Sequence, residues 1–422
     1  MAKLPPDSVC DRISRGVLLL LGIGMVLAIL IPAGPGWDFA NFYDAGHKIV
    51  AGQTADLYNS RVLIEGKPAE GHLPYYGTPI SAVLLAPLGW LSPRAGLMAF
   101  KIQNTLALLL ALWFLYRQHQ PVAARAGLTR SQHQCLFLVA AALFQPFWTI
   151  FRVGGQTTPT LCLGFVLALG WLASGRLLAA AVSLVSVVAI KPAFVLVLAV
   201  LAVLAGVRFF LYAAGCGMAA GALSVLAMGW RIHQSFLQHI TEQKISSWTY
   251  NSSLSVFADN LYVVVGPSSL WRALGLAVRL LAAALLIVAW LRGRRGVVSQ
   301  GARLHWLFLT AVTAGVALMP IVWEHYLSVL FLPVAYLLAL LPGLERAQIR
   351  LLVLVCGFAA TQNVVLILWL SDHLQLHSVP SVLVAAILKS APLLLSTLLL
   401  WHARRQLITL YNDPGARLQS PR

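Results

Sequence analysis

The chain has 422 residues, of which 59% are hydrophobic and 10% are charged, and its mean hydropathy is +0.81. Since about a quarter of the residues in a soluble domain are charged, this composition excludes a soluble globular protein. It predicts an integral membrane protein with a single polytopic domain over residues 1–422. Because backbone polar groups cannot stay unpaired in lipid, we expect an all-α fold. The net charge of +17 lies mainly in short Arg-rich loops between apolar runs, which indicates membrane topology and no nucleic-acid partner.

Apolar runs of about 20 residues, or somewhat fewer in bent helices, predict transmembrane helices. Twelve runs meet this description: residues 17–33, 96–116, 134–151, 158–174, 177–190, 192–206, 209–229, 270–291, 304–320, 326–342, 349–370 and 380–401. Basic loops held in the cytoplasm put both termini on that side. The apolar segment 78–91 is short and holds Pro79 and Pro87. If it crossed, the basic loop 117–130 would lie outside, so we expect a re-entrant or interfacial helix there, with thirteen spans as the alternative.

This threading leaves two long loops on the non-cytoplasmic side, residues 33–77 and 230–269. Both are long enough to fold over a cavity at the level of the membrane. The first loop contains Asp38, Asp44 and Asp56, three of the 13 acidic residues of the chain. We therefore expect the working face of the protein to be extracytoplasmic.

The first loop also contains apolar residues at helical spacing across 39–50, followed by Gly52 as a stop. This pattern predicts a short amphipathic helix on the membrane surface. Asp38 precedes the helix, and two interpretations remain open: an N-cap that accepts backbone N–H groups, or a catalytic carboxylate with one oxygen left free. Asp44 falls on the polar face, where we expect it to be in solvent.

Lys191 interrupts two apolar runs in SVVAIKPAFVL, and Pro192 breaks the helix beside it. An ionisable residue in such a place is costly and marks a candidate functional site. The alternative is a lysine whose ammonium group reaches the interface while its stem stays in lipid. Because Lys191 is predicted on the face opposite the basic loops, we favour the binding of an anionic group such as a lipid phosphate.

Arg152 ends one predicted span, and Gly154, Gly155 and Gln156 open the next. Glycines before the start of a helix let backbone N–H groups approach an anion. A phosphate site and a plain interhelical turn both fit this pattern.

Glu324 and His325 follow a proline and a tryptophan at a predicted membrane boundary, in MPIVWEHY. As neighbours on a helix they point about 100° apart, so we expect no mutual pair. His325 could donate to a phosphate or change its charge near neutral pH. A hydrogen-bonded histidine at the boundary is the equally open alternative.

His373 and His377 lie four residues apart in SDHLQLH, but no acidic or cysteine cluster accompanies them. We therefore predict no metal site, and no cofactor. The chain also lacks the motifs GxxxxGK[ST], HExxH and GxSxG, which leaves ATPase, zincin and hydrolase functions without support.

Six motifs occur in an order that resembles bacterial membrane glycosyltransferase family eighty-seven. They are WDFANFYDAG, YYGTPISAVLLAPLGWL, GGQTTPTLCLG, LAAAVSLVSVVAIKPAFVLVLAVL, YNSSLSVF and PIVWEHYLSVL. The resemblance covers residues 35–335 or so. The family includes the mycobacterial polyprenol-phosphate-mannose-dependent mannosyltransferases of the GT-C superfamily.

The resemblance implies a GT-C-type helical bundle in the inner (plasma) membrane. Such an enzyme transfers one sugar, with inversion, from a polyprenyl-phosphate donor to a lipid or glycan acceptor on the extracytoplasmic face. In that superfamily an aspartate of the first outer loop is the general base, and Asp38 matches it. The match at His325 implies a second polar residue near the donor phosphate, and Lys191 matches the Lys-Pro of the family. The other candidates for donor or substrate binding lie in these motifs or, for Arg152, just before one of them: Arg152, Gln156, Tyr43, Glu324 and Asn251.

Four motifs depart from the family pattern, and the departures bear on the donor sugar and the acceptor more than on the fold. Tyr76-Gly77-Thr78-Pro79 stands for Tyr-Pro-Pro, Thr158 or its neighbour for Asn, Asn251-Ser252-Ser253 for Asn-Gln-Ser, and Glu324-His325-Tyr326 for Asp-His-His. Mannose is the default donor sugar.

A transporter or lipid flippase is the main alternative function. Such proteins tend to show inverted repeats and charges near the membrane midplane. The sequence shows no repeat, and its candidate polar residues gather at one predicted face. This one-sidedness favours an enzyme that works at the interface.

Overall fold

The computed structural model describes residues 4–30, 37–58, 63–64, 67–68, 75–152, 155–242, 251–266, 268–293, 300–361 and 379–412. Almost every element in this part of the chain is a helix. In chain order the elements are α1 (Asp7–Leu30), α2 (Trp37–Val50), η1 (Thr54–Asp56), β1 (Leu63–Ile64), β2 (Lys67–Pro68), α3 (Pro79–Gly89), α4 (Pro93–Arg125), α5 (Arg130–Leu143), α6 (Gln145–Arg152), α7 (Thr158–Ala173), α8 (Leu177–Ile190), η2 (Pro192–Phe194), α9 (Val195–Ala205), α10 (Val207–Met228), α11 (Trp230–Glu242), α12 (Val256–Val265), α13 (Ser269–Gly293), α14 (Gln300–Leu318), η4 (Glu324–Leu330), α15 (Phe331–Ala339), η5 (Leu341–Gly343), α16 (Arg346–Thr361) and α18 (Val379–Asn412).

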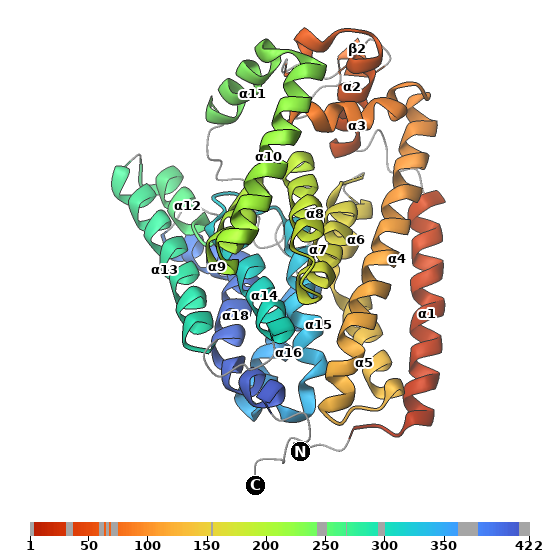
Figure 1. Cartoon of the computed structure of the whole chain (residues 1–422), viewed down its shortest axis with the longest axis vertical. Coiled ribbons are helices and arrows are strands. Elements are labelled where there is room, and N and C mark those ends of the chain that lie inside the picture. The colour runs from red at the N-terminus through yellow and green to blue at the C-terminus, as the bar shows by residue number, and fades with distance from the viewer. Residues whose placement is uncertain are drawn as a thin grey trace.

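The two ends of the bundle differ. Figure 1 shows α2, α3, α11 and the antiparallel β1–β2 hairpin gathered at one end, which we call the loop end. The start of α1 and the last turns of α18 lie at the opposite end. α11 and α10 both pack against α3, so the first predicted outer loop and the start of the second one fold together.

Five helical segments are long and apolar enough to cross a membrane, judged by length and composition over the described residues. They are Asp7–Leu30, Pro93–Arg125, Val207–Met228, Ser269–Arg292 and Ala386–Ala403. Six shorter apolar helical segments accompany them. Large apolar side chains such as Leu20 and Leu226 are exposed on the outer helices, as lipid contact requires. These features fit a multi-pass membrane protein, while the count of about twelve spans stays a prediction.

Three of the predicted spans are not continuous α-helices, which corrects the sequence analysis; one of them, 192–206, starts as the 3₁₀ helix η2 before α9 begins. The segment 134–151 divides between α5 and α6, and the segment 326–342 starts as the 3₁₀ helix η4 before α15 begins. Pro146 accounts for the first break: in the first turn of α6 its missing N–H is tolerated, whereas inside one long helix it would remove a backbone hydrogen bond.

The short apolar segment 78–91 forms α3, with Thr78 as N-cap and Pro79 in the first turn. Its 11 residues span about 16 Å, well short of the hydrocarbon thickness of a bilayer. This length fits the expected re-entrant or interfacial helix.

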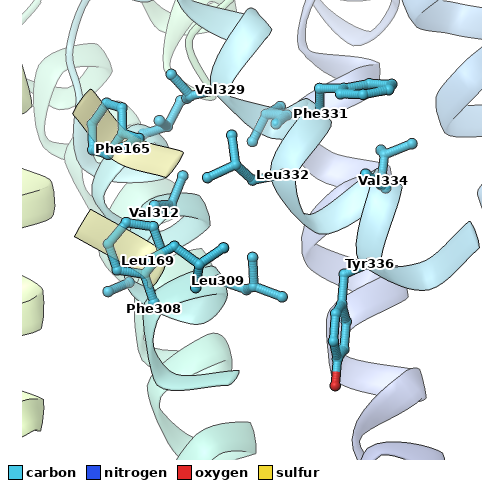
Figure 2. Close-up of a cluster of buried hydrophobic side chains, with 14 of the residues drawn as sticks. Phe165, Leu169, Phe308, Leu309, Val312, Val329, Phe331, Leu332, Val334 and Tyr336 are labelled. Carbon is cyan, nitrogen blue, oxygen red and sulfur yellow. The ribbon is translucent and has the colours of Figure 1, made fainter. Parts of the chain in front are cut away.

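The apolar core lies where α7, α9, α14 and α15 meet η4 and α4. Figure 2 shows side chains of α7, α14, η4 and α15 in one buried cluster; the labelled residues are Phe165, Leu169, Phe308, Leu309, Val312, Val329, Phe331, Leu332, Val334 and Tyr336. Because this cluster joins α7 to η4 directly, it fixes the two segments that carry several of the candidate site residues.

The helix predicted in the first loop exists as α2, but its polar face is not in solvent. Asp44 and Lys48 are each 3% exposed and form an ion pair of 2.7 Å, one helical turn apart. The expectation that Asp44 is solvated was therefore wrong. The reason is tertiary: α3 and α4 pack against α2 and cover it.

Lys101 of α4 holds the end of α1 that leads toward α2. This side chain is buried, and its ammonium group donates a hydrogen bond of 2.9 Å to the carbonyl of Ala28. A cation at the C-terminal end of a helix is stabilised by unpaired carbonyls and by the helix dipole. The end of α1 is thereby anchored to the bundle just before the chain reaches the first outer loop.

Candidate active site

Asp38 lies in the first turn of α2, one residue after the helix begins at Trp37. It is therefore within the helix rather than at the N-cap, and it is partly exposed. A carboxylate in the first turn is favoured by the helix dipole. Phe39, the next residue, is buried against Phe100 of α4 at a ring distance of 5.6 Å, which fixes this end of α2.

The segment that opens α7 packs against the same end of α2. Gly155 has a φ of 91°, and a Cβ at this position would lie 3.1 Å from the Phe100 ring and 3.4 Å from Cβ of Phe39. A side chain here would be strained by the backbone and crowded by α2 and α4. The glycine predicted to matter for an anion site thus allows this turn to pass close to Asp38.

The start of α7 carries several buried polar side chains. Thr157 is the N-cap, but its hydroxyl makes no capping hydrogen bond. The side-chain oxygens of Gln156, Thr157 and Thr158 are buried and find no hydrogen-bond partner in the described part of the chain. Buried polar groups are nearly always satisfied in folded proteins, so this helix start has the character of a binding site for a polar group, in addition to its unpaired N–H groups.

Lys191 separates α8 from η2 in an extended conformation, with φ −136° and ψ 95°. This confirms the predicted break beside Pro192. The hydroxyl of Thr78, the N-cap of α3, donates a hydrogen bond to the carbonyl of Ala189, which lies two residues before Lys191. This hydrogen bond joins the loop end to the segment that carries Lys191.

Lys191 reaches η4. Its ammonium group lies 5.1 Å from the centre of the Tyr326 ring, a cation–π distance. Phe194, in η2, packs on the same ring at 5.5 Å. The ring of His325 packs edge-on against the same Tyr326 ring at 4.8 Å. Two candidates that are 134 positions apart in the sequence are therefore neighbours in the fold.

η4 is a 3₁₀ helix of seven residues, Glu324–Leu330, and all seven are buried. Such helices seldom exceed four residues, and longer ones often mark functional segments. With three residues per turn, residues three apart share a face. His325 and Ser328 therefore share one face, and Nε2 of His325 and Oγ of Ser328 are both buried without a partner in the part of the chain that is described.

Asn251 holds η4 in place. Its side-chain oxygen accepts backbone N–H groups of Val322 and Ser253, each at 3.0 Å, and its amide donates to the carbonyl of Pro320. An isolated β-bridge with Trp323 adds to this connection. The Asn side chain is thus engaged by the backbone on both sides of the turn before Glu324.

Tyr43 makes its hydrogen bond elsewhere, between α2 and the residues that follow α3. It is buried in α2, and its hydroxyl donates to the carbonyl of Leu91 at 2.8 Å. This contact joins α2 to the end of α3, a structural use of the side chain.

An aromatic cluster joins α11 to the first outer loop. Tyr58 stacks near Tyr75 at 6.1 Å and packs on Phe236 and His239 of α11, while Tyr76 stacks on His239 at 4.8 Å. Burial raises the pKa of the Tyr58 and Tyr75 hydroxyls above their usual range, so both stay protonated. Tyr58 uses its proton to bind the carbonyl of Gly77. The cluster fixes the loop that precedes Thr78.

The structure thus places Lys191 against η4, which carries His325, and packs the turn at Gly155 against Phe39, the neighbour of Asp38 in α2. For Arg152 it gives the backbone at the end of α6, and its side chain lies outside the described residues. His373 and His377 also lie outside them. Within the described ranges no group of three or more His, Cys, Asp and Glu could hold a metal ion, and the absence of a metal requirement stays a prediction.

Lys389 is a buried residue of this region that the sequence analysis did not single out. It lies on α18, which packs against η4. The signal that could have found it is the one used for Lys191: an ionisable residue inside an apolar run.

The comparisons with known proteins agree with the resemblance described above. The model of glycosyltransferase family 87 matches residues 75–320, more than half of the chain. The class is thus a membrane-associated glycosyltransferase, and the chain belongs to glycosyltransferase family 87. A comparison with curated proteins finds no match. The matched range includes Gln156, Lys191 and Asn251, whereas Asp38 and His325 fall outside it.

Proposed function

We propose that this glycosyltransferase moves a single sugar, mannose by default, from a polyprenyl-phosphate donor to a lipid or glycan acceptor. The reaction takes place on the extracytoplasmic face of the plasma membrane and inverts the anomeric centre. The observation that carries the proposal is the meeting of a cation, Lys191, with the segment that holds His325, whose buried imidazole nitrogen has no hydrogen-bond partner among the described residues. This arrangement suits a phosphate with a lipid tail.

Asp38 is the proposed general base. A sugar hydroxyl is a weak nucleophile, so a carboxylate must take its proton as the oxygen attacks the anomeric carbon. One C–O bond forms between acceptor and sugar, and the bond between the sugar and the phosphate oxygen breaks. Its electron pair leaves with polyprenyl phosphate, and the acceptor proton stays on the carboxyl group of Asp38. The position of Asp38 in the first turn of α2, beside the turn at Gly155, supports this role.

Lys191 and His325 are the proposed partners of the donor phosphate, together with Gln156 and the first N–H groups of α7. Negative charge builds up on the leaving phosphate, and donors placed in advance stabilise it. Arg152 belongs to this set by its position at the end of α6. Asn251 and Tyr43 act through the backbone they hold, Asn251 on the turn before η4 and Tyr43 on the end of α3.

The topology supports an extracytoplasmic site. The end of α4 and the start of α5 lie at the end of the bundle away from α2 and α3 (Figure 1), and they carry Arg125 and Arg130. Positive residues favour the cytoplasmic side, which puts the loop end outside. A transporter is the competing function, and it predicts no dependence on a base at Asp38.

The test is sugar transfer by the purified protein in detergent, with radiolabelled polyprenyl-phosphate mannose as donor. We expect transfer by the wild type and a loss of about 10²- to 10⁴-fold in kcat for Asp38→Asn, the usual contribution of a general base. The matched control is Asp56→Asn, since Asp56 is an exposed carboxylate of the same loop. It should retain full transfer.

Three outcomes separate the possibilities. Transfer by a folded Asp38→Asn variant at the wild-type rate would return Asp38 to a purely structural role at the helix start. If neither the wild type nor any variant transfers the sugar but the donor still binds, the acceptor or the sugar is a different one. If the protein neither binds nor transfers any polyprenyl-phosphate sugar, the proposed donor class is rejected.

A further inference from the structure

One face of η4 carries a row of three side chains. A 3₁₀ helix has three residues per turn, so side chains three positions apart lie in line along its axis. His325 and Ser328 form such a pair within η4, about 6 Å apart along the axis at a rise of about 2 Å per residue. Phe331, the residue that follows η4, continues the line. We call these three residues the η4 row.

The contacts of Phe331 show where the row points. Its ring packs on those of Phe144 at 5.2 Å and Phe147 at 5.1 Å, where α6 begins. Tyr326 is turned to another side of η4, since its ring meets Lys191. The η4 row therefore lies on the side of α6, which itself packs against η4.

The two polar members of the row are buried. Ser328 is 0% exposed and His325 is 5% exposed. Oγ of Ser328 and Nε2 of His325 find no hydrogen-bond partner among the residues that the structure describes. A helical serine commonly donates its hydroxyl to a carbonyl four residues earlier, as Ser186 and Ser390 do in this chain. Within the described ranges Ser328 makes no such bond, so its hydroxyl is available to a bound molecule.

The neighbouring charge favours an anion as that molecule. Lys191 lies over the ring of Tyr326, the residue next to His325. Glu324 belongs to a different line of η4, the one that continues with Leu327. A hydroxyl and an imidazole can each donate one hydrogen bond, and donors beside a cation suit the oxygens of a phosphate.

We propose that Ser328 is a further donor-binding residue, whose hydroxyl donates to one oxygen of the donor phosphate while Nε2–H of His325 donates to another oxygen of the same phosphate. This inference rests on the proposed function and deepens it. Hydrogen bonds of about 2.7–3.0 Å from two donors one turn apart can converge on a single phosphate group. Ser328 touches the donor and takes no proton in the transfer.

The test is direct binding of polyprenyl phosphate, the leaving group of the proposed reaction, to the purified protein in detergent. We expect Ser328→Ala to raise Kd about 10- to 100-fold, the loss that follows removal of a hydrogen bond to a charged group. Polyprenol has the same tail and no phosphate, and it should bind the wild type and the variant equally. Ser328→Cys keeps the shape of the side chain but donates poorly, so it should also weaken the binding of polyprenyl phosphate.

The matched control is Ser224→Ala, on α10. Ser224 is also a buried serine, but its hydroxyl is hydrogen-bonded to Nε2 of His233 at 2.8 Å. Ser224→Ala should therefore lower Tm and leave Kd for polyprenyl phosphate unchanged. Ser328→Ala should behave in the opposite way. Because it removes a buried hydroxyl that has no partner in the described part of the chain, Tm without ligand should stay level or rise.

The outcomes separate this inference from the proposed function. A folded Ser328→Ala variant with the Kd of the wild type would overturn the inference. An equal loss of affinity for polyprenol would overturn it too, because Ser328 would then act through packing. If Ser328→Ala does not fold, Ser328→Cys supplies the same comparison. If the wild type itself does not bind polyprenyl phosphate, the proposed donor class is rejected, and the role of Ser328 with it.

Discussion

Gly46 of α2 and Gly89 of α3 lie in direct backbone contact, so that a Cβ on Gly89 would stand 2.6 Å from the carbonyl carbon of Gly46. Small residues let two helices approach this closely. The contact determines the distance between α2, which carries Asp38, and α3, whose N-cap Thr78 binds the segment before Lys191.

Replacing Gly46 by alanine should separate α2 from α3. The new Cβ would overlap the carbonyl of Leu85, and we expect a loss of about 1–3 kcal/mol in stability, as for other overpacked sites. Thermal unfolding in detergent measures it. Gly22→Ala on α1 is the matched control, because nothing lies within 4 Å of that position. It should leave Tm unchanged or raise it, and an equal loss at both glycines would contradict the close contact.

The ion pair between Asp44 and Lys48 makes Asp44 a structural carboxylate. Asp44→Asn leaves a buried ammonium group without its charge partner, and breaking a buried pair costs about 3–5 kcal/mol. The double variant Asp44→Asn/Lys48→Met should recover part of this loss, which thermal unfolding can measure. Recovery of stability with near-normal transfer would separate Asp44 from the chemistry assigned to Asp38. Failure of the double variant to recover any stability would speak against the pairing.

Lys191→Gln should weaken donor binding and transition-state stabilisation together. A hydrogen bond to a charged group contributes about 1.5–3 kcal/mol, so kcat/KM for the donor should fall by about 10- to 100-fold. Lys191→Arg keeps the charge and should retain a larger share of activity. Lys101→Gln removes another buried lysine and should leave kcat/KM for the donor unchanged. An unaltered kcat/KM for Lys191→Gln would restore the interpretation of Lys191 as an interfacial lysine.

Thr78→Val should disturb the site from a distance. The substitution removes the hydrogen bond from α3 to the carbonyl of Ala189 while keeping the shape of the side chain, and a net loss of about 1 kcal/mol in stability is usual for such a bond. Because Ala189 is two residues from Lys191, we also expect a several-fold rise in KM for the donor. Ser186→Ala removes a hydrogen bond within α8 alone and should have no effect on KM. Equal KM values for both variants would show that Thr78 does not position Lys191.

The sequence was informative where one helix alone decides the structure. The break at Lys191 follows from the proline beside it, and α3, α7 and α10 begin and end close to the residues that hydropathy and capping indicated. The helix in the first loop was also predicted from its spacing. These features depend on local propensity and on the length of apolar runs.

The remaining features depend on contacts between distant segments. Asp44 falls on the polar face of α2 in the sequence, yet α3 and α4 cover it, which no single helix reveals. The proximity of Lys191 to Tyr326 likewise required the packing of η2 on η4.

The place of α18 at the end of the chain has a consequence for biosynthesis. Chains emerge from the ribosome N-terminus first, so Asp38, Lys191 and His325 are all made before α18. Until α18 has been made and has packed against η4, the segment that carries His325 lacks one of its neighbours. A chain that is still being inserted into the membrane therefore presents η4 without the helix that contacts it in the folded protein.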